Sequence, residues 1–356
     1  MQNQTVHFAT NRIWMPEKAD FGLSLAQPPA RLLAGRCLCQ ASADPRVEAV
    51  VGAPNLVKER DPDAGLVDIL RAWLAAAAAA NATPLLFCHG FNHGFRAAIA
   101  RTASLSAWLE AAPGAPRFMP FAFTWPSNGE GSADAYRNDQ ADAAASGLAL
   151  ARLIAALAGQ ASARKPIYMA HSMGVRATRC GMQAILPLLP ALRRPVFARA
   201  FLIAGDDETD VLDAPWRATG TDTTQGGVRP IAELAEQVEI GVNRADGVVW
   251  LVSGVVNQGK RLGAAGPAHP DDLPANVAVV DYSMTVSTED KKPVPQTEIE
   301  MNWIGHQYQR NDVAVRADLL AAIAHGGPAA SVPGRRPARL AGTAIDEIPG
   351  RFYPAP

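Results

Sequence analysis

The sequence predicts an α/β protein with a mostly parallel central sheet that has helices on both faces. Two observations predict it: short apolar runs alternate with amphipathic helical stretches, and these runs are apolar at nearly every position. Such strands, separated by helices, are typical of a parallel sheet buried on both sides. No linker interrupts the alternation, so we expect a single domain over residues 1–326. Residues 327–356, rich in Pro, Gly and Arg, are expected to form a tail that is either strapped over the domain or partly disordered.

The individual elements follow from local signals. Residues 61–62, Asp-Pro, are a typical helix start, and apolar residues then recur at helical spacing over 66–74. A helical stretch passing through residues 105 and 109 follows the strand expected at 84–88. A long helix is expected at 132–157 and a final one at 312–325, each followed by a glycine stop. Strands are expected at 84–88, 118–123, 166–170, 198–204, 238–242 and 277–280.

The composition limits the possible functions. Among 356 residues, 48% are hydrophobic and 19% are charged, which is ordinary for a soluble globular protein. The formal net charge is −1, so electrostatics give no reason to expect nucleic acid or an anionic membrane as a partner. The first residues lack the pattern of a secretory signal, and no apolar stretch approaches the roughly 20 residues of a membrane helix. We therefore expect a cytoplasmic protein without integral membrane contact.

The four cysteines fit this expectation. They are scattered, and Cys37-Leu38-Cys39 has no second ligand pair at zinc-finger spacing. We interpret them as reduced thiols, with a periplasmic setting left open.

The strongest sign of chemistry is the segment 167–174, in which a strand is followed by Ala-His-Ser-Met-Gly and then by a helical stretch. A strand, a small-x-Ser-x-Gly turn and a helix form a nucleophile elbow, in which the residues two before and two after the serine must be small. Ala170 stands where glycine is common. The turn exposes the serine oxygen near the positive end of the helix. We therefore predict that Ser172 is a nucleophile; a serine that merely caps a helix is the alternative.

A second motif, His89-Gly90-Phe91-Asn92, follows a strand well upstream of the serine. A His-Gly loop at this place supplies one backbone N–H of an oxyanion hole, and the residue after the nucleophile supplies the other. The expected donors are Phe91, or its neighbour Asn92, together with Met173. We expect His89 to shape this hole by hydrogen bonding and to transfer no proton.

The general base is expected late in the chain, after the nucleophile and the acid. His306, in Gly305-His306-Gln307-Tyr308, follows the last strand-like run and precedes the final helix. His171 is expected to point away from Ser172. The positions of the remaining histidines, on a strand, before the nucleophile, in a proline-rich loop and at a helix end, fit a base less well: His7, His89, His93, His269 and His325. A loop histidine without a catalytic role is the alternative for His306.

The acid has two candidate positions. Asp246 directly follows the strand at 238–242, where a carboxylate can hold the tautomer of an imidazole and stabilise its protonated form. Asp206 and Asp207 follow the preceding strand and could serve instead; a solvated loop or a helix cap is the alternative for this pair. We favour Asp246, and the order Ser–Asp–His fits either position.

The motifs together resemble a bacterial family of α/β-hydrolases of unknown function, related in pattern to serine esterases and lipases. The resemblance extends from about residue 6 to about residue 325. It rests on five motifs in order: FATNR (8–12), HGFNHGF (89–95), FTWPSNG (123–129), AHSMG (170–174) and GHQY (305–308). It implies the α/β-hydrolase fold, matches the family's serine and late histidine to Ser172 and His306, and places an acid-bearing segment that ends in RLG (261–263) at Asp246. It supplies no substrate.

The predicted activity is that of a carboxylesterase acting on a small, uncharged and largely apolar ester through an acyl-serine, with no metal or organic cofactor. Residues expected to bind or line the substrate site are Phe91, Asn92, His89, Trp125, Trp216, Trp250 and Leu251. An acyltransferase or amidase using the same triad is one alternative. A non-catalytic binding protein that retains the fold is the other.

Overall fold

The computed structural model describes residues 1–44, 47–57, 62–128, 132–217, 224–249, 254–286, 305–339 and 347–354. Its strands are β1 (Gln2–Thr10), β2 (Arg12–Met15), β3 (Asp20–Leu25), β4 (Leu33–Ala41), β5 (Val50–Val51), β6 (Asn55–Leu56), β7 (Thr83–Cys88), β8 (Phe118–Thr124), β9 (Ile167–His171), β10 (Phe197–Ile203), β11 (Ala235–Val242), β12 (Val277–Asp281), β13 (Arg336–Arg339) and β14 (Glu347–Tyr353). Its helices are α1 (Pro62–Ala79), α2 (Phe95–Glu110), α3 (Ala133–Ala145), α4 (Gly147–Ala158), α5 (Gly174–Ile185), α6 (Ile231–Leu234), α7 (Gly254–Asn257), α8 (Leu262–Ala265), α10 (Tyr308–Asn311) and α11 (Val313–His325).

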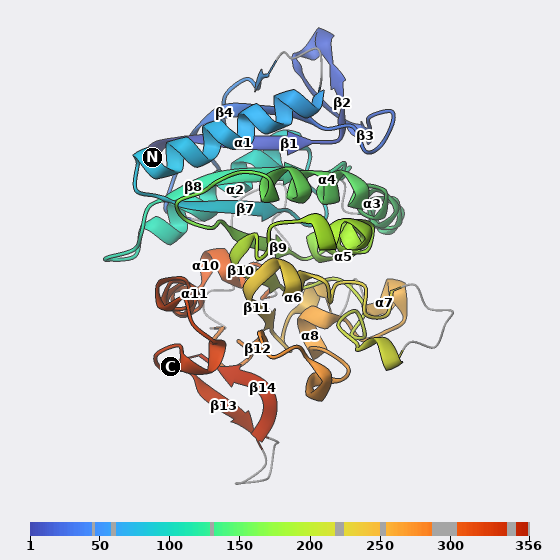
Figure 1. The fold of residues 1–356 in the computed structure, drawn as a ribbon, viewed down its shortest axis with the longest axis vertical. Helices are drawn as coiled ribbons and strands as arrows, with labels where there is room; N and C mark the ends of the chain where they lie inside the picture. Colours follow the sequence, from blue (N-terminus) through green and yellow to red (C-terminus); the bar gives the residue numbers. More distant parts are fainter. Residues whose placement is uncertain are drawn as a thin grey trace.

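The large sheet has the strand order β13-β14-β12-β11-β10-β9-β7-β8-β1-β4-β5, with β6 also paired to β4, while β2 and β3 form a separate hairpin (Figure 1). From β1 to β14 every neighbouring pair is parallel. Antiparallel pairs occur at the two ends, where β4 meets β1, β5 and β6, and where β13 meets β14. The predicted mostly parallel α/β sheet is therefore confirmed.

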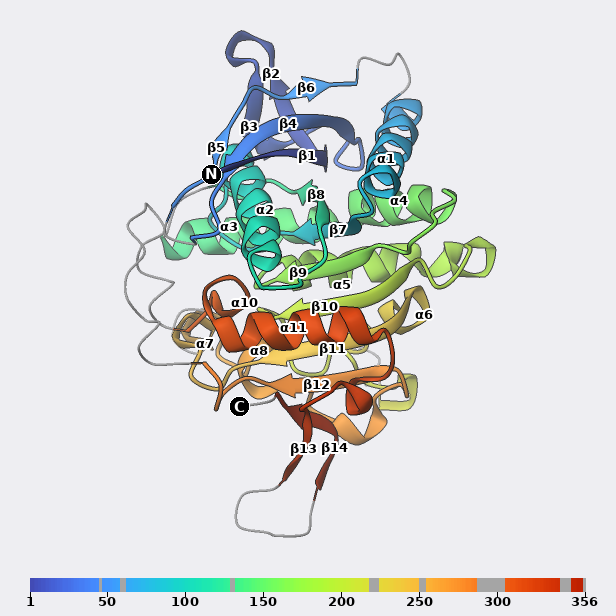
Figure 2. The same ribbon diagram turned by 90° about the vertical axis from the view of Figure 1, so that its left-hand side faces the viewer.

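Apolar strands explain this arrangement, because β7, β9 and β12 are buried at every position. One face of the sheet packs against α1, α4 and α5 through a large apolar cluster, and the other packs against α2 and α11. Figure 2 shows α2 and α11 in front of the sheet, with α4 and α5 behind it. Both faces are thus covered, as the continuous apolar runs predicted.

The long helix expected at 132–157 is divided into α3 and α4 at Ser146. The Ser146 hydroxyl accepts a hydrogen bond from the Asn11 amide at 2.9 Å, which ties the helix to the end of β1. Residues 133–158 together form the one described helical run that is long and apolar enough to cross a membrane by length and composition. The expectation that no stretch approaches this length was therefore wrong. More than half of its most apolar window, 56%, is buried inside the molecule, as in a core helix.

The described part of the predicted tail extends the sheet. β14 pairs in parallel with β12, with Val279 opposite Arg351. The Arg351 guanidinium binds the buried carboxylate of Asp281 at 2.5 Å. Where the domain ends and a tail begins stays a prediction.

Candidate active site

Loops from four neighbouring parallel strands meet at one edge of the sheet. The His-Gly loop follows β7, Ser172 follows β9, Asp206 follows β10 and Asp246 follows β11. Because these strands are parallel and adjacent, their carboxyl ends lie side by side. This edge is where open α/β sheets bind ligands.

Ser172 lies on a sharp turn between β9 and α5. Its φ of +55° is in the left-handed region, which is strained for a residue with a side chain. Hydrogen bonds hold this conformation: the Ser172 N–H donates to the Ile203 carbonyl at 3.0 Å, and its carbonyl accepts from Asp206 at 3.1 Å and Val175 at 3.0 Å. The serine is therefore fixed in place by β10 and α5 before any substrate binds.

Two glycines allow the chain to pack around this turn. A Cβ on Gly174 would lie 2.6 Å from the carbonyl oxygens of Cys88 and His89, so no other residue fits between α5 and the end of β7. A Cβ on Gly90 would lie 2.7 Å from the Ser172 Cβ and 3.2 Å from its Oγ. The His-Gly loop thus runs directly against the serine.

His306 is hydrogen-bonded to Asp246. Its Nδ1 lies 2.7 Å from the Asp246 Oδ2, and both side chains are buried. A carboxylate accepts, so Nδ1 donates to Asp246, and Nε2 is the nitrogen that can accept a proton when the ring is neutral. The other oxygen of Asp246 accepts from the N–H groups of Val248 and Val249 at 3.1 and 3.0 Å.

The loops that carry the acid and the histidine are tied together. The Asn243 amide donates to the Gly305 carbonyl at 2.9 Å, and Gly305 adopts a φ of +76°. The buried Tyr308 hydroxyl donates to the Gly241 carbonyl at 2.9 Å and accepts from the Ala204 N–H at 3.0 Å. The GHQY motif therefore contains the turn, the histidine and the anchor of this loop.

The rival carboxylates have other partners. Asp206 accepts from the Tyr136 hydroxyl at 2.5 Å and from Arg261 at 3.1 Å. Asp207 is fully buried and binds Arg179 at 2.8 Å. Within the part of the chain that the structure describes, only Asp246 of the three contacts an imidazole.

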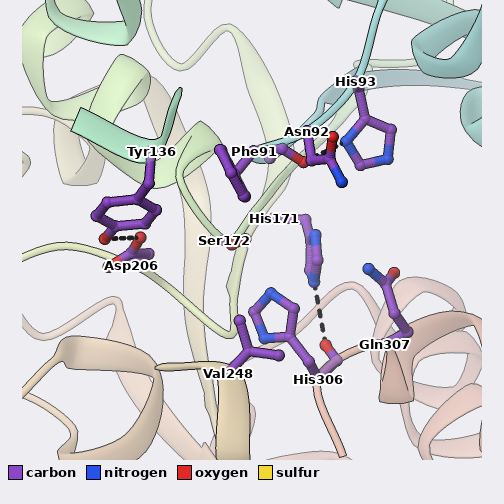
Figure 3. Close-up of a pocket in the computed structure, with 11 residues that line it drawn as sticks. Phe91, Asn92, His93, Tyr136, His171, Ser172, Asp206, Val248, His306 and Gln307 are labelled. Carbon is purple, nitrogen blue, oxygen red and sulfur yellow. Dashed lines mark hydrogen bonds between the residues drawn. The ribbon is translucent and has the colours of Figure 1, made fainter. Parts of the chain in front are cut away.

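Ser172 and His306 line one pocket of about 480 Å³, including space open to solvent (Figure 3). Its lining residues are Gly90, Phe91, Asn92, His93, Tyr136, His171, Ser172, Asp206, Val248, His306 and Gln307. Tyr136 and Asp206 lie on one side of Ser172, and Asn92, His93 and Gln307 on the other. Phe91 and Asn92 both line the pocket. Met173 is buried behind the turn.

The pocket lacks the tryptophans expected to line it. Trp125 is fully buried, stacks on His89 with ring centroids 5.0 Å apart, and donates from its indole to the His89 carbonyl at 2.9 Å. Trp216 is 72% exposed and lies outside the pocket. Those two lining predictions are wrong, because one indole is needed for packing and the other faces solvent. Trp250 and Leu251 lie outside the described residues.

His89 also does not line the pocket. Its Nδ1 donates to the Gly90 carbonyl at 2.8 Å, and its Nε2 accepts from the Trp125 N–H at 3.3 Å. Burial lowers the pKa of His89 to about 3, with the Arg12 charge adding to the effect. These contacts stabilise the His-Gly loop from outside the pocket, so the prediction that His89 binds substrate is wrong.

His171 was expected to point away from Ser172, yet it lines the same pocket. The turn at Ser172 is so sharp that both side chains reach the cavity. The His171 Nε2 donates to the His306 carbonyl at 3.1 Å, and the two rings lie 4.7 Å apart. Burial lowers the pKa of His171 well below its ordinary value, so the ring is neutral. Two further lining residues were not predicted from the sequence. Tyr136 lies in no motif, whereas Gln307 lies in the GHQY motif.

The FATNR motif supports the His-Gly loop from outside the pocket. The fully buried Arg12 donates to the His93 carbonyl at 2.6 Å and to the Thr124 hydroxyl at 3.2 Å. Asp139 accepts from the Asn128 N–H at 2.9 Å and from the Ser127 hydroxyl. Burial raises the pKa of Asp139, and its hydrogen bonds oppose the shift.

Within the described residues, no group of three or more His, Cys, Asp or Glu side chains could hold a metal ion.

The fold and this edge of the sheet are those of an α/β-hydrolase. The model of a family described as alpha/beta hydrolase of unknown function (DUF900) matches residues 69–294, more than half of the chain. The chain belongs to this family. Ser172 and Asp246 lie inside the matched region, and His306 lies beyond it. No curated protein and no solved structure gives a significant match.

Proposed function

We propose that this hydrolase is a serine carboxylesterase that cleaves an uncharged carboxylic ester through an acyl-serine intermediate. One observation carries the proposal: a serine at φ +55° shares a pocket with a histidine whose Nδ1 is bound to a buried aspartate at 2.7 Å. A serine is a weak nucleophile until a base takes its proton, and that base needs a third group to hold its tautomer.

In the proposed mechanism His306 accepts the hydroxyl proton of Ser172 as the serine oxygen attacks the ester carbonyl. Asp246 holds the imidazole and stabilises its protonated form. His306 then donates the proton to the leaving alcohol oxygen. Water repeats the sequence on the acyl-serine and releases the acid.

The oxyanion formed during attack needs N–H donors. The backbone N–H groups of Phe91 and Met173 donate no hydrogen bond within the described residues. The Asn92 N–H, by contrast, donates to the Asp139 carboxylate at 3.4 Å. Phe91 and Met173 are therefore the favoured pair over Asn92. Each such donor contributes about 2.7–4 kcal/mol to transition-state stability in comparable enzymes.

The pocket favours a neutral substrate. Its described lining includes no lysine or arginine and one carboxylate, Asp206, which Arg261 and Tyr136 already engage. An anionic substrate would meet no positive partner there. We further propose that the protein acts in the cytoplasm.

The test is hydrolysis of p-nitrophenyl esters from acetate to palmitate by the wild type, Ser172→Ala and the surface control Ser162→Ala. We expect Ser172→Ala to lose roughly 10⁴–10⁶-fold in kcat while Ser162→Ala keeps it. A serine-directed phosphonate should label the wild type at Ser172. Failure of every ester together with no labelling would overturn the proposal in favour of a binding protein. Products formed with added alcohols or amines would separate an acyltransferase from an esterase.

A further inference from the structure

One side of the pocket has two side-chain amides whose NH₂ groups have no hydrogen-bond partner among the described residues. Gln307 is 6% exposed, and its Oε1 accepts from the Arg310 guanidinium at 3.3 Å and from Gln309 at 3.5 Å. Arginine can only donate, so this bond fixes which end of the amide is oxygen. The Nε2 group of Gln307 is therefore the end directed to the pocket (Figure 3).

The amide of Asn92 lies across from Gln307. Its Oδ1 is buried without a hydrogen-bond partner, and its Nδ2 has none among the described residues. Asn92 has a φ of +65°, and its N–H is turned to Asp139 at 3.4 Å. The backbone thus presents the amide to the cavity.

The NH₂ groups of Gln307 and Asn92 are not among the fully buried atoms that lack a partner, so solvent or a ligand in the pocket can reach them. Polar groups in folded proteins are nearly always hydrogen-bonded to protein or to water, and a ligand that displaces the water here must supply acceptors in its place. By contrast Tyr136 and Asp206, on the other side of Ser172, are bonded to each other at 2.5 Å. The open hydrogen-bonding capacity of the pocket is therefore on the side of Asn92 and Gln307.

We propose that the amides of Gln307 and Asn92 form a donor subsite for a neutral acceptor oxygen, an ether, hydroxyl or carbonyl, in the alcohol part of the substrate ester. This rests on the proposed esterase function. His306 must reach the leaving oxygen to protonate it, and the next residue, Gln307, lines the same pocket, so we place the alcohol part of the ester on the Gln307 side. Arg310, by donating to the carbonyl end of the Gln307 amide, strengthens its N–H as a donor.

The ligand is neutral because the pocket's described lining includes amides but no lysine or arginine. Burial lowers the pKa of both His93 and His171 well below the ordinary value. A carboxylate would meet no compensating charge beside Asp206. An apolar alcohol would leave both amides unsatisfied.

The test compares two butanoate esters of equal length, the 2-methoxyethyl and the n-butyl ester, by kcat/KM. The preference is the ratio of the two values, and comparing this ratio between variants cancels the difference in their intrinsic reactivity. We expect Gln307→Met and Asn92→Gly each to lower the preference about 3- to 10-fold, the loss of one hydrogen bond. The control Gln160→Met, the same kind of change beyond the end of α4, should keep the wild-type preference.

A second variant reverses the chemistry. In Gln307→Glu the donor becomes an acceptor, so the 2-hydroxyethyl ester should gain over the 2-methoxyethyl ester relative to wild type. An unchanged preference in Gln307→Met and Asn92→Gly, even with lower rates on both esters, would overturn the subsite while the esterase function stands. No hydrolysis of any ester by the wild type, with no phosphonate labelling, would overturn both.

Discussion

Two groups of buried ionisable side chains include residues of the neighbouring strands β10 and β11 or of the loops that follow them. The groups differ in whether any hydrogen-bonding atom is left without a partner. The first, the closed cluster, joins Arg199 on β10, Glu239 on β11, Asp318 on α11 and Arg335. Arg335 donates to both oxygens of Glu239, at 3.0 and 2.8 Å, and to Asp318 at 2.7 Å, and Arg199 also binds Oε1 of Glu239. The second is the pair of Asp246 and His306, at the carboxyl end of β11.

In the closed cluster each carboxylate meets an arginine, and the four side chains are at most 4% exposed. Among the described residues, none of the four lines the pocket of Ser172 and His306. In the pair, by contrast, Nδ1 of His306 is bonded to Asp246 and Nε2 has no hydrogen bond among the described residues, in a pocket that also contains two amide NH₂ groups without a partner there. Buried charge alone therefore does not distinguish the candidate active site. Hydrogen-bonding groups that line a cavity and have no partner do.

The largest expected effect concerns the pair. In Asp246→Asn the amide cannot hold the Nδ1–H tautomer of His306, and we expect kcat to fall about 10⁴-fold, as for the same change in a related triad. Stopped assays on a p-nitrophenyl ester would measure it, with circular dichroism to confirm the fold.

The control is Asp206→Asn, which removes the rival carboxylate from Arg261 and Tyr136. Its main effect should be on stability, with kcat per folded molecule falling far less than in Asp246→Asn. A larger fall in kcat for Asp206→Asn would reassign the acid.

The next effect concerns the closed cluster. Arg335→Met leaves the carboxylates of Glu239 and Asp318 partly uncompensated, and breaking a buried ion pair from one side costs about 3–5 kcal/mol in the free energy of unfolding. Urea unfolding would measure it, and kcat of the folded protein should stay close to wild type. The neighbouring exposed Arg336→Met is the control, with a change within about 0.5 kcal/mol. Equal stability of the two variants would show that the ion pairs of Arg335 do not stabilise the folded protein.

Much of the fold and part of the candidate site could be predicted from the sequence, for physical reasons. Strands such as β7 and β9 are buried on both faces, so their composition alone marks them. Ser172 lies in a turn whose neighbours must be small, and this requirement is visible in five consecutive residues. Chain order and strand position favour His306 and Asp246, but they leave Asp206 and Asp207 open as the acid.

What could not be predicted depends on tertiary contacts. Trp125 and Trp216 are the same residue type, yet one stacks under His89 and the other faces solvent. Tyr136 reaches the pocket from a helix with no motif. The role of residues after 326 depends on Arg335 meeting two carboxylates from distant elements, which composition cannot indicate.

The smallest expected effect concerns His89, which is buried behind the oxyanion loop. Its pKa is lowered from 6.5 to about 3, so between these pH values the unfolded chain binds a proton that the folded chain does not. Stability is then fully present above pH 6.5 and is lost as the pH falls towards 3, by about 1.4 kcal/mol per pH unit for this group. Asp142, whose pKa burial raises to about 6, acts in the opposite direction between pH 3.8 and 6.

Urea unfolding of wild type and His89→Asn from pH 7 to 4.5 isolates the contribution of the histidine to the free energy of unfolding, because the contribution of Asp142 is common to both. The variant should be less stable at pH 7 and lose less stability on acidification, whereas His325→Asn, at an exposed helix end, serves as the control. Parallel curves for wild type and His89→Asn would mean that His89 is protonated in the folded protein, and the bracing hydrogen bond from Trp125 to its Nε2 would then not exist.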